Sequence, residues 1–121
     1  MTHQLNFIYN DSDWICPAEY PDLSKATEIA IDLETKDPNI KTKGPGWATF
    51  DGHIVGFAVA ALGQQWYFPI AHDAGGNMDL SITCAWMQDI LKLPATKIFH
   101  NASYDVGWLL VNGFEIRGKI V

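Results

Sequence analysis

The sequence predicts an α/β fold built on a mixed β-sheet, and three features lead to this prediction. Alternating apolar residues mark a strand at 28–34, a hairpin is predicted at 54–70, and two helical segments flank a short apolar strand at 97–99. Strands interspersed with helices are typical of α/β architecture. With 121 residues, of which 48% are hydrophobic, the chain can bury one core and is too short for two domains.

The start of the chain is predicted to be a lead-in and not a packed element. Residues 1–26 contain Pro17, Pro21 and several acidic side chains, although 5–9 has the composition of a short strand. We therefore expect the domain itself to begin at residue 27.

The first strand of the domain carries two acidic residues on one face. Between Glu28 and Glu34, every second residue is apolar, and Asp32 and Glu34 occupy alternate positions between Ile29, Ile31 and Leu33. Side chains two residues apart on a strand point to the same side of the sheet, so the two carboxylates can coordinate one cation together. The apolar neighbours indicate a central strand, where two unpaired acids would be costly to bury. A solvated edge strand is the alternative.

The middle of the chain reads as a loop followed by a hairpin. Residues 35–52 contain Pro38 and several glycines and are predicted to be a loop. The runs 54–62 and 65–70 are predicted to be two strands, with the chain reversal at Gly63 and Gln64.

In the second half of the domain, the spacing of apolar residues predicts helices. Residues 80–93 are predicted to form a helix that Pro94 ends, and the residues expected on its apolar side are Ile82, Trp86, Ile90 and Leu93. After the strand at 97–99, Asn101 is a suitable N-cap for a helix over 102–112, and 119–121 reads as the start of another strand.

Composition leaves the binding partner open. The formal net charge is −6 with a pI near 4.9, and an acidic chain repels nucleic acid unless bound cations reverse the charge locally. The sequence has neither a membrane-spanning run nor a signal peptide, so we expect a cytoplasmic protein with no membrane partner. Cys16 and Cys84 lie too far apart in the sequence, and outside any CxxC spacing, to indicate a disulfide framework or zinc site.

A second acidic residue lies where a strand gives way to a helix. Asp105 falls in the first turn after Asn101. The ends of sheet strands are where α/β folds commonly bind ligands. Taken alone, Asp105 is better explained by its favourable interaction with the helix dipole than by a functional role.

Together the two motifs resemble the first and second motifs of the DEDD exonuclease superfamily, Asp-x-Glu at Asp32 and Glu34 and Asn-x-x-x-Asp at Asn101 and Asp105. The segments around them look like parts of the 3′-5′ exonuclease (proofreading) domain of DNA polymerase I-like family A polymerases, in the same order. These segments are residues 29–35, 67–72 and 112–118.

The resemblance implies a ribonuclease H-like mixed sheet with flanking helices and a metal-dependent exonuclease activity on the 3′ end of single-stranded DNA. It implies that Asp32 bridges two Mg²⁺ or Mn²⁺ ions, that Glu34 helps hold the first, and that Asp105 serves the second through water. By the same resemblance, Thr35, Asn101 and Tyr104 would contact the terminal nucleotides.

Two departures from the family pattern bear on these expectations. The family places a hydrophobic wedge a few residues after Asp-x-Glu, where this chain has Lys36-Asp37-Pro38-Asn39-Ile40. The third family motif, Tyr-x-x-x-Asp or His-x-x-x-Asp, is not found between Asp105 and Val121, and residues 9–13 fit the pattern only by coincidence. We therefore expect residues 27–121 to be the N-terminal part of the exonuclease domain, truncated and weakly active or inactive alone.

Other functions remain open at this stage. The same fold could trim RNA, or it could be a non-catalytic exonuclease-like domain supporting a neighbouring polymerase domain. An unrelated α/β binding module with chance acids is a third reading. If the chain is a fragment, an uncovered apolar sheet face could also produce a homodimer.

Overall fold

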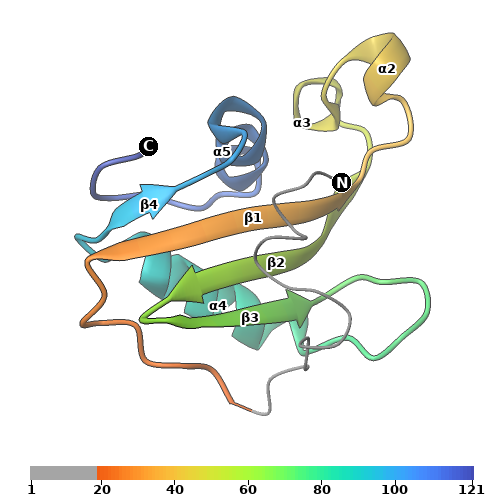
Figure 1. Cartoon of the computed structure of the whole chain (residues 1–121). Helices are drawn as coiled ribbons and strands as arrows, with labels where there is room; N and C mark the ends of the chain where they lie inside the picture. The colour runs from red at the N-terminus through yellow and green to blue at the C-terminus, as the bar shows by residue number, and fades with distance from the viewer. Residues whose placement is uncertain (1–18) are drawn as a thin grey trace.

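The computed structural model describes residues 19–121, which form a four-stranded mixed sheet with helices (Figure 1). This confirms the α/β prediction. The lead-in features at 5–9, 9–13 and Cys16 lie outside the described residues. The elements are β1 (Glu28–Lys36), α2 (Ile40–Lys43), α3 (Gly46–Thr49), β2 (His53–Ala61), β3 (Gln64–Pro69), α4 (Leu80–Leu91), β4 (Thr96–Ile98) and α5 (Ala102–Val111).

Strand β1 is central, as the alternation of its residues predicted. The sheet order is β3-β2-β1-β4; β1 pairs with β2 in antiparallel fashion along most of its length. Its parallel pairing with β4 covers only Glu28 to Ala30. Within residues 19–121, the edge of β1 beyond Ala30 therefore has no strand beside it on that side, and this opening lies next to Asp32.

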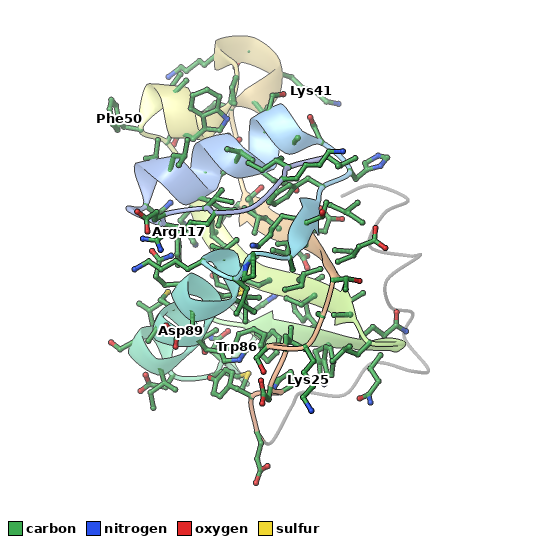
Figure 2. The ribbon with its side chains drawn as sticks, turned by 90° about the vertical axis from the view of Figure 1, so that its left-hand side faces the viewer. Lys25, Lys41, Phe50, Trp86, Asp89 and Arg117 are labelled. Atoms are coloured by element: carbon green, nitrogen blue, oxygen red, sulfur yellow. The ribbon has the colours of Figure 1, made fainter. Side chains whose placement is uncertain are left out.

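One face of the sheet carries the hydrophobic core. Figure 2 shows α4 and α5 on the same side of the sheet, where their apolar side chains pack on the strands. The buried residues of this cluster include Ile29, Ile31 and Leu33 from β1, Phe57 and Val59 from β2, Phe68 from β3, Met87, Ile90 and Leu91 from α4, and Trp108 and Leu109 from α5.

The other face of β1 presents Asp32 and Glu34, because successive side chains of a strand alternate between faces. Small residues lie opposite them on β2, where Ala58 pairs with Asp32 and Gly56 pairs with Glu34. The sheet therefore separates an apolar side from a side bearing carboxylates.

Several predicted elements differ in detail from the observed ones. The predicted loop at 35–52 contains the end of β1 and the short helices α2 and α3. The hairpin turns at Leu62 and Gly63, one residue earlier than predicted, with φ of 53° and 73°. Two consecutive positive φ values are typical of the tight turns that match strand twist. Residues 119–121 contribute only a single bridge, between Lys97 and Ile120.

Helix α4 buries most of the apolar side predicted for it, since Ile90 is buried and Trp86 and Leu93 pack against the core. Its buried residues are Thr83, Met87, Ile90 and Leu91, whereas Ile82 is 57% exposed. The helix begins with an N-cap that the sequence reading missed, because the Asp79 side chain accepts a hydrogen bond from the Ile82 amide at 2.8 Å. None of the helices in residues 19–121 is long and apolar enough to cross a membrane.

A buried lysine joins α4 to the end of the chain. Lys97 on β4 is fully buried, and its Nζ donates to the backbone carbonyls of Leu93, Ala95 and Arg117. Burial lowers the pKa of Lys97. The three carbonyls supply the partners that a buried ammonium group needs.

Candidate active site

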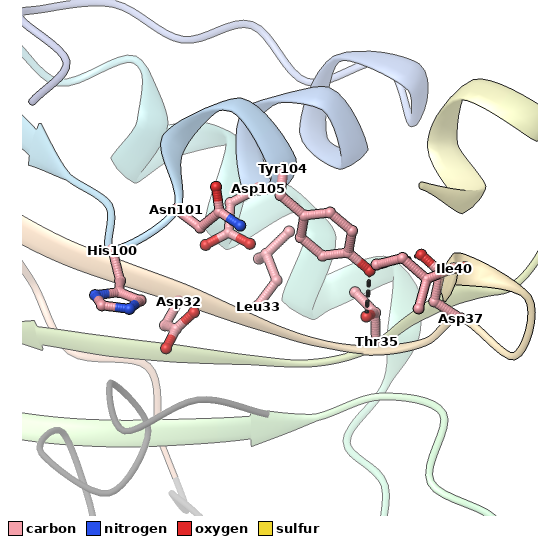
Figure 3. A pocket seen from close by; sticks show the side chains of 9 residues that line it. All are labelled: Asp32, Leu33, Thr35, Asp37, Ile40, His100, Asn101, Tyr104 and Asp105. Atoms are coloured by element: carbon pink, nitrogen blue, oxygen red, sulfur yellow. Dashed lines mark hydrogen bonds between the residues drawn. The ribbon is translucent and has the colours of Figure 1, made fainter. Parts of the chain in front are cut away.

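Asp32 and Asp105 come together at the open edge of β1. Asp32 lies on the strand and Asp105 on the first turn of α5, and both line a pocket of about 290 Å³. They are 3% and 2% exposed, respectively. Figure 3 shows the Asp32 carboxyl group at β1 and the Asp105 carboxyl group at the start of α5. The structure thus brings together two of the three acids predicted from the sequence.

Burial raises the pKa values of both carboxyl groups in the pair. Burial raises the pKa of Asp32 to about 6, with Asp105 and His100 acting in the opposite direction. Burial and the negative charge of Asp32 raise the pKa of Asp105 to about 8. Two adjacent carboxylates with little access to water cannot both carry a charge unless something compensates them. At neutral pH the pair therefore requires either a proton or a cation.

The donor atoms of this pair suit a divalent cation. Asp32 Oδ2 and Asp105 Oδ2 are buried and have no hydrogen-bond partner. Unsatisfied buried carboxylate oxygens are costly, and Mg²⁺ and Mn²⁺ prefer oxygen ligands. Among residues 19–121, however, no cluster of three His, Cys, Asp or Glu side chains is positioned to hold a metal ion. The carboxyl pair is therefore the part of a cation site that these residues form.

Glu34 has a different environment from the pair. Its Oε2 accepts a hydrogen bond from the Tyr67 hydroxyl at 2.9 Å, and Glu34 does not line the pocket. Its half-buried side chain nevertheless lies on the same face of β1 as Asp32, two residues further along. The predicted chelating geometry of Asp32 and Glu34 remains a prediction.

Thr35 and Tyr104 are joined by a hydrogen-bond network at the far end of the pocket. The Tyr104 hydroxyl lies 2.9 Å from Thr35 Oγ1 and donates to Asp37 Oδ2 at 2.7 Å. Asp37 Oδ2 also accepts the Gly46 amide at 2.9 Å, which ties the chain around α3 to the pocket. Figure 3 shows the Tyr104 ring extending across the pocket toward Thr35. No role was predicted for Asp37 from the sequence.

Asn101 lies at the mouth of the same pocket. It occupies the N-cap position of α5, as predicted, but its side chain makes no capping hydrogen bond. Its amide is exposed and therefore accessible to a ligand. The preceding residue, His100, also lines the pocket, although it is not part of either sequence motif. Its place directly after β4 was the available signal.

Trp47 of α3 supports the wall of the site that α5 forms. Its indole ring packs on α5 at Gly107, where an added Cβ would lie 2.4 Å from the ring. The close approach requires glycine at this position. Figure 2 shows Phe50, just beyond α3, projecting away from the body of the domain, where it is 89% exposed.

Comparisons with known proteins define the class of fold. No protein-family model matches the chain. NrnC of Brucella melitensis, in a structure with bound Mg²⁺, is 20% identical, with a TM-score of 0.50 over 84% of this chain and 44% of that one. The catalytic core of RRP6 from Trypanosoma brucei is also 20% identical, with a TM-score of 0.48 over 81% of this chain and 23% of that one. The fold is ribonuclease H-like, as the resemblance implied.

A sequence match adds a relation to a polymerase. A DNA-directed DNA polymerase of Pseudomonas phage M6 is 33% identical over 116 residues, which make up 92% of this chain and 18% of the polymerase. The chain thus spans less than a fifth of the length of the relative it matches. The sequence relation to a DNA polymerase and the ribonuclease H-like fold both agree with the resemblance that the two motifs indicated.

Proposed function

We propose that the chain is a 3′-5′ exonuclease domain of a DNA polymerase I-like protein, which hydrolyses the 3′-terminal phosphodiester of single-stranded or frayed DNA. The observation that carries the proposal is the Asp32 and Asp105 pair, which lines the pocket and has two buried oxygens without a hydrogen-bond partner. The phage polymerase relative supports a DNA substrate and a polymerase domain in the same full-length protein. The bound Mg²⁺ named for NrnC supports a divalent cofactor. Removal of unpaired 3′ nucleotides is proofreading.

Asp32 and Asp105 are the residues that would hold Mg²⁺ or Mn²⁺, with Glu34 as a further ligand from the same strand. When bound, a pair of such ions supplies a hydroxide nucleophile and neutralises charge on the leaving 3′-oxygen. The chain's own contribution is to hold the carboxylates in a water-poor site, where their attraction for cations is strong. Without cations the same carboxylates repel phosphate, so substrate binding depends on metal.

The remaining pocket residues suit the end of a nucleic-acid strand. The Tyr104 ring offers a flat surface for the terminal sugar or base, and its bonds to Thr35 and Asp37 fix its position. The exposed amide of Asn101 can donate to a phosphate oxygen. An unpaired terminus fits such a pocket better than a duplex end, because its last nucleotide is already free of its partner.

A single-turnover nuclease assay tests this function. The chain, in large excess over a 5′-labelled single-stranded oligonucleotide and with Mn²⁺, is expected to produce a ladder of products shortened from the 3′ end. We expect Asp32→Ala and Asp105→Ala to be at least about 100-fold slower, because each removes a carboxylate of the pair. Asp89→Ala, which removes one exposed charge from α4, is the matched control and should retain the wild-type rate. No shortening, or equal shortening by Asp32→Ala, would refute the proposal.

The same assay decides between DNA and RNA. We expect faster shortening of DNA than of an RNA oligomer of matched sequence, and the reverse preference would favour an RNA-trimming enzyme of the same fold.

A further inference from the structure

A chain of hydrogen bonds reaches Glu34 from β3. The Tyr67 hydroxyl donates to Glu34 Oε2 at 2.9 Å, and the same hydroxyl lies 2.5 Å from His72 Nε2. A tyrosine hydroxyl has one proton. Because that proton is donated to the carboxylate, the contact with His72 requires the imidazole Nε2–H as the donor. The bonds therefore run in one direction, from His72 through Tyr67 to Glu34.

His72, the first donor in this series of hydrogen bonds, is itself held in place. The His72 amide donates to Asn77 Oδ1 at 2.8 Å, and Asn77 Nδ2 donates back to the His72 carbonyl at 3.0 Å. The His72 ring meets the Tyr67 ring edge-on, with centroids 5.6 Å apart and 74° between the planes. Both the backbone and the ring of His72 are thus fixed, so the donor is aimed at Tyr67.

Gly56 makes room for the Tyr67 hydroxyl. This glycine pairs with Glu34 across β1 and β2, and an added Cβ would lie 1.9 Å from the Tyr67 hydroxyl oxygen. Any other residue at 56 would push the phenol away from Glu34. Tyr67 is only 3% exposed, so the hydroxyl reaches the carboxylate from a buried ring. The glycine thus leaves the space that the hydroxyl occupies beside Glu34.

We propose that His72 and Tyr67 are positioning residues that fix Glu34 for a divalent cation shared with Asp32. The inference rests on the proposed function. The Tyr67 hydroxyl donates a hydrogen bond to Glu34 Oε2, whereas Glu34 Oε1 makes no hydrogen bond within residues 19–121. Oε1 is therefore the oxygen that remains for the ion. A glutamate side chain loses rotamer freedom when it binds a metal, and a partner that orients it beforehand reduces that loss.

Three variants and a control test the inference in the intact 121-residue chain. Tyr67→Phe removes the donor to Glu34, His72→Ala removes the donor to Tyr67, and His72→Gln restores an N–H at a similar reach. Tyr20→Phe is the control, because it also removes a partly buried hydroxyl, one that lies 2.6 Å from Thr83 Oγ1. Mn²⁺ affinity is measured by calorimetry, the rate is measured on single-stranded DNA, and unfolding is followed with urea.

We expect Tyr67→Phe and His72→Ala to weaken Mn²⁺ binding and to slow the reaction by about 10- to 100-fold, the usual effect of losing a residue that orients a ligand. His72→Gln should recover most of that loss. Tyr20→Phe should change affinity and rate by less than about twofold, even if it lowers stability as much as Tyr67→Phe does.

The outcomes separate the inference from the function on which it rests. If the wild type binds Mn²⁺ and degrades DNA while Asp32→Ala does neither, and Tyr67→Phe and His72→Ala behave like Tyr20→Phe, the positioning role is wrong and the function stands. If His72→Gln is as impaired as His72→Ala, the direction of the hydrogen bonds is wrong and the inference fails. If the wild type neither binds Mn²⁺ nor degrades DNA, the proposed function fails and the inference fails with it.

Discussion

The carboxyl pair makes a specific prediction about stability in the absence of metal. The pKa values of Asp32 and Asp105 rise from 3.8 to about 6 and about 8 on folding. The folded protein therefore holds protons that the unfolded chain releases between about pH 4 and pH 8. The sign follows from linkage: where the folded state binds more protons, the free energy of unfolding falls as pH rises. This contribution is complete below pH 4 and is lost as pH rises through the folded pKa values.

Asp105→Asn isolates the effect, because the amide keeps the shape of the carboxyl group and removes its charge. A rise in the Asp105 pKa from 3.8 to about 8 corresponds to roughly 6 kcal/mol at ~1.4 kcal/mol per pKa unit. Even buried sites in proteins respond with an effective dielectric constant nearer 20 than 4, so we expect about half of this. In EDTA at pH 8, Asp105→Asn should be more stable than the wild type by ~3 kcal/mol, and at pH 5 the difference should be small.

Urea unfolding at the two pH values measures this difference, and the comparison with the wild type cancels the titration of other groups. Adding Mn²⁺ at pH 8 should stabilise the wild type and not the variant. The reasoning is refuted if Asp105→Asn is no more stable than the wild type at pH 8, or if its advantage is as large at pH 5.

Two further predictions concern residues around the site. Lys97→Met should lower the free energy of unfolding by about 3 kcal/mol at pH 7, because buried carbonyls lose their donor; urea unfolding that differs by less than ~1 kcal/mol would contradict this. Asp37→Ala should lower the free energy of unfolding by about 2 kcal/mol, since Tyr104 and Gly46 lose a hydrogen-bond acceptor. It should also raise KM for single-stranded DNA more than it lowers kcat. Steady-state kinetics with unchanged KM would count against that role.

The parts of the fold that follow from local pattern were predictable from the sequence. The alternation around Asp32 predicted a central strand, and the strand-to-helix boundary at Asn101 placed Asp105 at the start of a helix. Both features depend on periodicity and chain order, which a sequence displays directly. Their meeting in one pocket follows from the short pairing of β4 with β1, which leaves the edge beside Asp32 open.

Contacts that depend on register were not predictable. The bond between Tyr67 and Glu34 joins residues 33 positions apart and requires both the pairing of three strands and a glycine at 56. On α4 only Ile82 was misjudged, because it is apolar and lies in the first turn but is 57% exposed. The apolar character of a residue near a helix end does not show whether another element will cover it.

The central claim is that Asp32 and Asp105 jointly hold a divalent cation, and a calorimetric titration with Mn²⁺ tests it most directly. The wild-type chain should bind Mn²⁺ near pH 7 with release of protons, visible as a heat that depends on the buffer, because a cation replaces the proton that the buried pair otherwise holds. Asp32→Ala should abolish the tightest binding and Asp105→Ala should weaken it by about tenfold or more, while Asp89→Ala should bind as the wild type does. Equal Mn²⁺ affinity in the wild type and Asp32→Ala, or binding without proton release, would contradict the account.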